Sequence, residues 1–389
     1  MIGVLKSNTL VALTREVTQG TPVEPTLPTD FVQVLADGLE INPIKEVLER
    51  TILTTNIGTP AGMNSTESVE GAFAVEYKGS GGPTPPQYGL AIESCLGGTR
   101  DVITQTTTAL GTINTFEVTG HAYEVGDLVV LKIAGANHVA FVQSILADVI
   151  TFVPSLPVGQ VVPLGTVITP SVTYFPTNTN QPTITATYYL GNEIKQQGTG
   201  CRVSSMSLEN FETGQIPTLN FSYNGLSFSR VDGAAPVVPT FQPNLPPVVL
   251  GATLSLPDGV CIKMNTFSLS VENTIAPLNT VCSPSGTISS FVTKRASTGT
   301  FNPYLDDTTV EWFNKFDSNA IFSLTLTLGV PSIVAGEVLA GSVVAIYMPQ
   351  VKISEIPTGD VEGILTDEIS FQASTGADGT GTDVFMAFA

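Results

Sequence analysis

Apolar and polar residues alternate strictly in several segments of the chain. In Phe322-Ser-Leu-Thr-Leu-Thr-Leu328 the apolar side chains share one face and the hydroxyls share the other. Because successive side chains of a β-strand point to opposite faces, this alternation predicts a strand with one buried face. The pattern recurs at 203–208, 218–223 and 267–271. Together these segments predict an antiparallel sheet with one face in a core and the other in water.

Helical patterns are scarce, and two stand out. The first covers 86–96, where a proline begins the segment and Gly97-Gly98 follows it, as is typical of helix ends. The second covers 306–316, with Asp306 and Asp307 at the positive end of the helix dipole and apolar residues at every third position from Val310. We therefore expect one short helix in each half of the chain.

The order of these elements repeats along the chain. Each half holds an extended segment, a loop rich in Thr, Ser and Gly, a second extended segment, a helix and a hairpin. Before the helices Glu40 aligns with Glu272, an offset of 232, and after them Glu209 aligns with Glu355, an offset of 146. The offset falls by 86 residues between the two alignments, so the first half is 86 residues longer than the second. We place most of these extra residues in an insertion after the helix of the first half.

The inserted segment has a strand pattern of its own. The stretches 124–135 and 138–146 are predicted strands joined by the turn Gly135-Ala-Asn-His138. A proline-rich stretch then connects the two halves as an extended linker. The predicted fold is mainly β, with two tandem β-sandwich or β-barrel folds that each carry one short helix, and a small inserted β module. The predicted limits are 1–97 with 172–233 for the first fold, 98–171 for the inserted module, 234–247 for the linker and 248–389 for the second fold.

Composition and charge narrow the class of protein. Of 389 residues, Lys and Arg total 15 and Asp and Glu total 34, which gives a net charge of −19. A protein that reads nucleic-acid sequence must neutralise phosphates, so this balance argues against one. Two uncharged stretches, 149–192 and 233–257, are interrupted by prolines, so we expect no membrane insertion. The N-terminus lacks the pattern of a secretory signal.

Few residues are suited to catalysis or metal binding. The four cysteines have no zinc-ligand spacing, and the two histidines, His121 and His138, are predicted to touch solvent in a loop and a turn. The chain has no Gly-x-Ser-x-Gly nucleophile motif and no Gly-Lys-Ser/Thr phosphate loop. We therefore predict a protein that is not an enzyme and that uses no cofactor and no metal.

Three further stretches carry a resemblance to a known family. The first is 12–22 followed by Phe31-Val-Gln-Val34, which forms a short strand, a loop ending in Gly-Thr and a second strand. The second is 70–77 followed by 85–97, a strand and a short helix that closes on Leu-Gly. The third is the hairpin strand at 200–209. With the repeated order of elements, these stretches resemble the major tail tube protein of a long-tailed, non-contractile bacteriophage (siphophage), in the form that fuses two folds in one chain.

The resemblance implies a structural virion protein. In that family, β-sandwich or β-barrel folds flanked by a helix join their sheets side by side into rings, which stack into the hollow tube through which DNA is ejected into the host. Two folds in one chain imply a trimeric ring with pseudo-six-fold symmetry, whereas a single fold would imply a hexamer. The implied partners are other copies of the chain, the tail terminator, the tape measure and baseplate-side tail proteins. Phage DNA would pass through the lumen without sequence-specific binding, and the tail would assemble in the host cytoplasm.

A long loop from 52 to 66 lacks any core pattern. Its position resembles that of the loop through which neighbouring rings touch in the family, so we predict an inter-ring contact there. The predicted contact residues are Ile57, Gly58, Thr59, Pro60, Ala61, Gly62 and Met63. We place the inserted module on the outer surface of the tube, because in the bore it would obstruct the channel.

Two other classes share the acidic, β-rich composition without catalytic motifs. One is a different virion structural protein, such as a capsid decoration protein or a baseplate-proximal tail protein, which would not polymerise into long tubes. The other is a β-rich adhesin or carbohydrate-binding module, which would carry a secretory signal and exposed aromatic platforms for sugars.

Overall fold

The computed structural model of the protein describes residues 5–52, 58, 61–82, 84–179, 181–283, 286–305, 310–332, 338–339, 341–375 and 381–389. These residues are mainly in β-strands, with two α-helices and two short 3-10 turns, η1 (Lys6–Asn8) and η2 (Pro28–Asp30). The prediction of a mainly β chain is confirmed.

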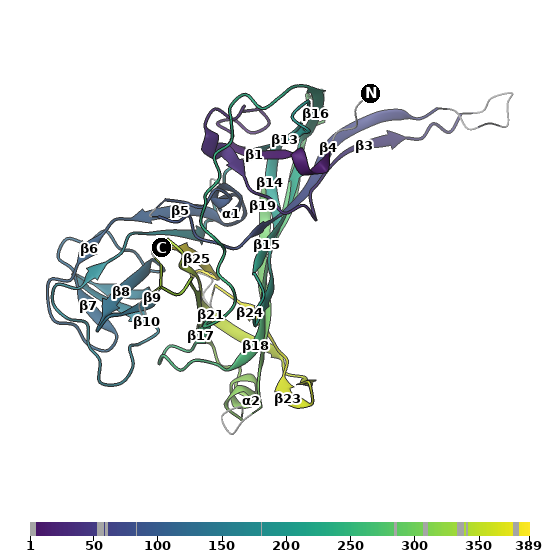
Figure 1. Ribbon diagram of the computed structural model, residues 1–389. Coiled ribbons are helices and arrows are strands. Elements are labelled where there is room, and N and C mark those ends of the chain that lie inside the picture. Colours follow the sequence, from purple (N-terminus) through teal and green to yellow (C-terminus); the bar gives the residue numbers. More distant parts are fainter. Residues whose placement is uncertain are drawn as a thin grey trace.

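A long antiparallel sheet runs through the centre of the molecule (Figure 1). Eight strands form it, and each pairs with the next. In spatial order they are β3 (Glu40–Leu48), β4 (Met63–Glu76), β15 (Thr218–Gly225), β14 (Ile194–Glu212), β18 (Met264–Asn279), β19 (Thr287–Pro303), β24 (Ile369–Ala373) and β21 (Val344–Glu355). We call this the main sheet. It includes three of the four segments in which strict alternation predicted strands, and 322–328 forms a neighbouring strand.

Further strands continue from the first halves of β14 and β21. β14 pairs with β13 (Ile184–Leu190) and β16 (Ser227–Asp232). β13 pairs in turn with β1 (Leu10–Arg15), and β1 pairs with β2 (Phe31–Val32). Beside β21 lie β20 (Phe322–Leu328), β17 (Thr253–Ser255), β25 (Phe385–Phe388), β12 (Ser171–Pro176) and β5 (Gly97–Val102). The strands enclose one continuous apolar core, in which Phe73 stacks on Phe221 with ring centroids 5.2 Å apart.

Both predicted helices are present at slightly shorter length. Helix α1 (Gly89–Leu96) ends at Gly97, whose φ of 120° is a conformation that a residue with a Cβ rarely adopts. Helix α2 (Val310–Asp317) packs through the buried Trp312, while Phe313 is exposed. Asp306 and Asp307, the predicted start of the second helix, lie outside the described residues.

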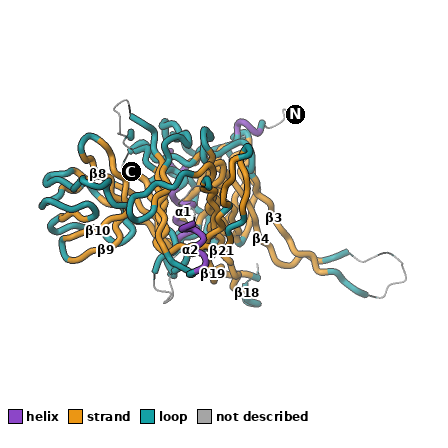
Figure 2. Tube along the Cα trace, turned by 90° about the horizontal axis from the view of Figure 1, so that it is seen from below, coloured by secondary structure: helices purple, strands orange, loops and turns teal. Residues whose placement is uncertain are grey.

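A separate six-stranded sheet occupies the segment between β5 and β12. Its strands, in spatial order, are β6 (Gln105–Thr106), β11 (Val167–Ile168), β8 (Leu128–Ile133), β9 (Ala136–Leu146), β10 (Val149–Val153) and β7 (Thr115–Glu117). We call it the small sheet, and it has its own apolar cluster. It also packs on the larger body, where Phe141 stacks on Tyr347 at 5.2 Å. Figures 1 and 2 place the small sheet and the long hairpin β3–β4 on opposite sides of the molecule.

The proline-rich stretch between β16 and β17 contains no strand or helix. It is held to the surface by hydrogen bonds, since the Thr240 amide donates to the Pro28 carbonyl at 3.1 Å and the Gln87 side chain donates to the Thr240 carbonyl at 2.6 Å. Near the C-terminus, β22 (Thr358–Val361) and β23 (Ile364–Asp367) form a small hairpin.

The two halves of the main sheet repeat one pairing pattern, because the order β3-β4-β15-β14 is followed by β18-β19-β24-β21. Gly71 of β4 pairs with Tyr223 of β15, and Gly299 of β19 pairs with Phe371 of β24. A Cβ atom on either glycine would overlap the paired aromatic ring. Each glycine therefore makes room for a buried ring at the same place in its half.

This pairing differs slightly from the sequence alignment of the halves. The offset from Gly71 to Gly299 is 228, whereas the offset from Glu40 to Glu272 is 232. Because side chains of a strand alternate with a period of two, alignments that differ by an even number place the same faces together. The close packing of a glycine under an aromatic ring distinguishes the two alignments and supports the offset of 228.

We predict that Gly71→Ala lowers the free energy of unfolding by about 1–3 kcal/mol, because the new methyl group displaces the Tyr223 ring inside a packed core. Chemical denaturation would measure the change. Gly82→Ala is the control, because nothing lies within 4 Å of a Cβ built there. Equal losses in the two variants would contradict the packing role of Gly71.

Candidate assembly surfaces

One face of the main sheet is covered by hydroxyl and acidic side chains. A shallow groove runs across this face, and we define the polar face by the polar residues that line the groove, together with their cross-strand neighbours. They are Ser205, Ser207, Glu209, Ser268, Ser270, Glu272, Thr298, Thr300, Ser354, Ser370 and Gln372. Cross-strand pairing extends the face to Ser222 and Glu40 in the first half, and to Lys294 and Lys352 in the second. Short hydroxyls therefore dominate a surface that carries few cations.

Two strands have a free side, β3 at one end of the main sheet and β22 just beyond its other end. Among the described residues, β3 has β4 as its strand partner, and β22, which follows β21 in the chain, has β23. Most side chains of β3 are exposed. Each of these edges carries a proline, Pro43 in β3 and Pro357 just before β22. Proline is typical of edge strands, because it lacks the N–H that an inner strand needs. Sequence reasoning missed the edges, and the two prolines were the signal for them.

The hairpin β3–β4 extends beyond the body of the molecule as an arm (Figures 1 and 2). An ion pair of 3.1 Å between Lys45 and Glu67 joins its two strands. Toward its far end, apolar side chains are exposed: Val47 is 56% exposed, Leu48 52% and Met63 60%. Apolar side chains gathered on a projecting hairpin indicate a surface that another protein covers.

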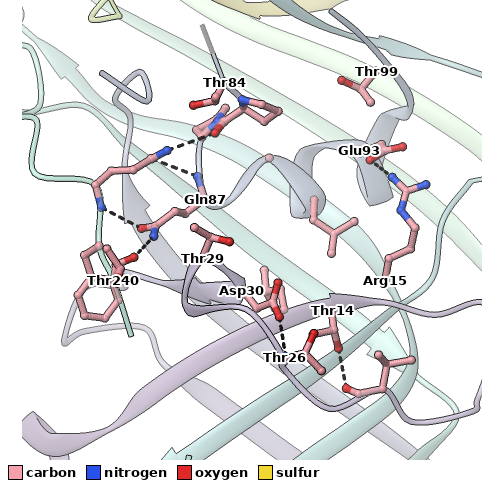
Figure 3. Close-up of a pocket in the computed structure, with 18 of the residues that line it drawn as sticks. Thr14, Arg15, Thr26, Thr29, Asp30, Thr84, Gln87, Glu93, Thr99 and Thr240 are labelled. Carbon is pink, nitrogen blue, oxygen red and sulfur yellow. Dashed lines mark hydrogen bonds and ion pairs between the residues drawn. The ribbon is translucent and has the colours of Figure 1, made fainter. Parts of the chain in front are cut away.

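A cleft of about 850 Å³ lies between α1 and the proline-rich stretch (Figure 3). Its polar side chains are bonded within the protein: Arg15 pairs with Glu93, and the Thr14 hydroxyl donates to the Val23 backbone carbonyl at 2.7 Å. Gln87 is held by the carbonyl of Thr240, as Figure 3 shows. Asp30, which also lines the cleft, accepts hydrogen bonds from the amides of Thr26 and Leu27 at 2.9 and 2.8 Å. These polar groups therefore hold the walls of the cleft together.

The described part of the chain contains no cluster of three or more His, Cys, Asp or Glu side chains that would hold a metal ion. Among its helices, none is long and apolar enough to span a membrane. The surfaces that stand out are therefore the polar face, the two free edges and the arm, all of which suit assembly better than chemistry.

Comparison with known families agrees with these surfaces. The family model described as "Phage tail tube protein" matches residues 6–373, which is nearly the whole chain. The chain belongs to the phage tail tube protein family. No curated protein matches it. The resemblance seen in the sequence is thus confirmed at the level of the family.

Membership makes this tail tube protein a structural component of the virion tail, which assembles with itself into a tube together with other tail proteins. The family is structural and not enzymatic. The match favours a tail tube over a capsid decoration protein and over an adhesin or carbohydrate-binding module.

The described part of the predicted inter-ring contact leads into the arm. Of its seven residues, Gly58, Ala61, Gly62 and Met63 are described, and Met63 begins β4. Ile57, Thr59 and Pro60 lie outside the described residues. The contact itself stays a prediction.

An ion pair joins the small sheet of this tail tube protein to the larger body. Arg100 of β5 donates through Nε to Asp127 Oδ1 at 2.7 Å and also pairs with Glu124. Its guanidinium lies 5.0 Å from the centre of the Phe175 ring. Burial raises the pKa of the Asp127 carboxyl, and the hydrogen bond from Arg100 opposes that rise. Asp127 is fully buried, so Arg100 is needed to compensate its charge.

The structure corrects the position of one histidine. His138 was predicted to touch solvent in a turn, but it belongs to β9, where it is half-buried and packs against Phe152 with ring centroids 5.7 Å apart. The turn is at Ala134 and Gly135, which both have positive φ, so the second strand starts two residues earlier than predicted. Burial lowers the pKa of His138, and its neutral ring bonds the Pro154 carbonyl at 2.9 Å.

We predict that Arg100→Leu lowers the free energy of unfolding at neutral pH by about 3 kcal/mol, because it leaves the Asp127 carboxylate buried without its partner. The loss relative to the natural protein should shrink as the pH falls. Removing Arg100 raises the pKa of Asp127 further in the folded state, so the folded variant gains a proton that removes the buried charge. Denaturation at a series of pH values would measure both effects.

Glu124→Gln is the matched control for this prediction. It removes the exposed partner of Arg100, which should cost less than about 1 kcal/mol. A loss from Arg100→Leu that does not change with pH would contradict the assigned role of Asp127.

Proposed function

We propose that this protein closes into a trimeric ring and that stacked rings form the tube of a non-contractile phage tail, through which DNA is ejected. The observation that supports the ring most directly is the main sheet, in which one chain supplies the same four-stranded unit twice in succession. The family match supports the tube. The discontinuous first fold, the inserted module, the linker and the second fold keep their predicted limits in this proposal.

Three chains would bring six such units into the ring. The junction of β14 with β18 already joins two units inside one chain. Closed rotational symmetry then pairs β3 of each chain with β22 of the next, so that both free edges at the ends of the main sheet are used. A ring of six chains would instead contain twelve units.

The polar face would line the bore of the tube. Its hydroxyls give DNA no fixed charge to bind, and glutamates such as Glu209 and Glu272 repel phosphates. The small sheet and the apolar core lie on other faces of the chain. DNA would therefore slide along the wall without sequence-specific contacts.

The arm would reach a neighbouring chain or ring in the assembled tube. Its exposed apolar end, with Val47, Leu48 and Met63, would then be covered. The tail terminator, the tape measure and baseplate-side proteins would bind at the two ends of the tube, and assembly would take place in the host cytoplasm.

We predict that the concentrated natural protein forms hollow tubes, and that a variant lacking 57–63 folds but forms none, because it lacks the end of the arm. Negative-stain electron microscopy would show the tubes, and circular dichroism would show that the variant is folded. Three-fold symmetry in averaged rings would distinguish three chains from six. Normal tubes from the deletion variant would overturn the role of the arm.

We also predict that tubes of a Ser222→Lys/Thr298→Lys variant retain short DNA duplexes when assembled in their presence, and that retention falls as salt is raised. Natural tubes should retain none. Sedimentation of the tubes with labelled duplex would measure the bound fraction. The control is Val158→Lys/Leu164→Lys, which adds the same charge at exposed positions of the inserted module. Equal retention by both variants would contradict the assignment of the polar face to the bore.

A further inference from the structure

We propose that the junction between neighbouring chains copies the β14–β18 junction residue by residue, so that the free edge at 355–361 pairs with the free edge at 39–44 of the next chain. This inference rests on the proposed ring. It adds the register of the contact, which follows from irregularities that the two halves share.

The first shared irregularity fixes the equivalence of β14 and β21. The pairing of β14 with β15 shifts between Val203 and Ser205, and that of β21 with β24 shifts between Ile353 and Glu355. The offset between the two bulges is therefore 150. The hairpin β22–β23 continues this equivalence, because Gly359 pairs with Thr366 just as Glu209 pairs with Thr218.

The second shared irregularity fixes the equivalence of β3 and β18. The pairing of β3 with β4 shifts so that Val47 lies opposite Asn64, and that of β18 with β19 shifts so that Ile275 lies opposite Val292. On both strands the offset is 228, which is also the offset from Gly71 to Gly299. A bulge is a specific local geometry, so its recurrence at one offset along two strands fixes the register.

The inner junction then gives the outer one. Within the chain, Ser205 pairs with Glu272 and Leu208 with Leu269. The residues of the outer junction follow from the two offsets. Adding 150 to each β14 position gives the residue at the 355–361 edge, and subtracting 228 from each β18 position gives its partner on the next chain. They are Glu355 with Ile44, Ile356 with Pro43, Thr358 with Ile41 and Val361 with Leu39.

Backbone directions at the free edge agree with this register. The Glu368 amide donates to the Pro357 carbonyl at 2.8 Å, so Pro357 points its backbone toward the inside of its own half. Neighbouring residues of a strand point the opposite way, so Ile356 and Thr358 present their N–H and C=O groups outward. Their counterparts Met206 and Leu208 pair with Val271 and Leu269 in the inner junction. Opposite Ile356 the outer junction has one hydrogen bond fewer, because Pro43 offers a carbonyl acceptor but no N–H donor.

The same equivalence predicts where the arm contacts the next chain. Inside the chain, Arg202 is buried and donates through Nε to the Ser290 carbonyl of the β18–β19 hairpin at 3.0 Å. The counterpart of Arg202 is Lys352, which is exposed, and the counterpart of Ser290 is Gly62 of the arm. Lys352 would therefore donate to the Gly62 carbonyl of the next chain, which brings the end of the arm to a lateral neighbour in the ring.

Disulfide trapping tests the register in the full chain. Cys261 and Cys282 are exposed and would first be changed to serine, while Cys95 and Cys201 are buried. Ile44→Cys/Glu355→Cys should then form disulfides between chains upon oxidation of the assembled protein. Within one chain the two positions lie at opposite edges of the main sheet, seven strand spacings or roughly 30 Å apart, so they cannot bridge.

Two controls share this background. Asn42→Cys/Glu355→Cys keeps the same face but shifts the register by two residues, so it should cross-link at least tenfold more slowly. Ser205→Cys/Glu272→Cys tests the inner junction and should oxidise without a change of mass. Non-reducing gels would follow the covalent dimer and trimer, and light scattering would follow the assembled mass.

Rapid covalent trimer from the Ile44/Glu355 pair alone supports the proposal. Two results would overturn the register and leave the proposed function intact, provided that the rings have their normal mass. In one, the shifted Asn42/Glu355 pair cross-links faster than the Ile44/Glu355 pair. In the other, neither pair cross-links. A mass that stays monomeric for the natural protein under all assembly conditions would overturn the proposed function, and the register with it.

Discussion

The pairing of β14 with β18 is the contact on which the rest of the molecule depends. Each half of the chain builds a four-stranded antiparallel unit. If the half stood alone, each outer strand of the unit would have a partner on one side only. Hydrogen bonding between the halves converts two marginal edges into the centre of one sheet. It also leaves the chain with one free edge of each kind, a geometry that closed rings require.

The equivalence of the two halves extends into the core, where each half packs an aromatic ring over a glycine. Gly71 beneath Tyr223 and Gly299 beneath Phe371 bring strands and rings together at equivalent positions of the two halves. The C-terminal strand β25 then pairs with β12 of the first half and β21 of the second. The two halves are thus held together by backbone pairing at two places.

The candidate surfaces were only partly predictable. The lack of catalytic motifs and the acidic composition already favoured a structural role, and the loop before Met63 was singled out for lacking a core pattern. The free edges and the polar face were missed, because a hydroxyl-rich strand face looks the same in sequence whether it meets bulk water or lines a channel. Only the pairing of strands distant in the chain shows that those faces form one surface.

The sequence by itself determined the local structure of this protein. Strict alternation defined the strand at Phe322–Leu328, Pro86 and Gly97 bounded the first helix closely, and the order of elements exposed the duplication. The tertiary structure decided the register of that duplication and the neighbours of each strand. Alternation with a period of two tells which face of a strand is buried but is unchanged by shifts of two or four residues. Bulges, rings packed over glycines and contacts between distant strands distinguish such shifts, and these exist only once the chain is folded.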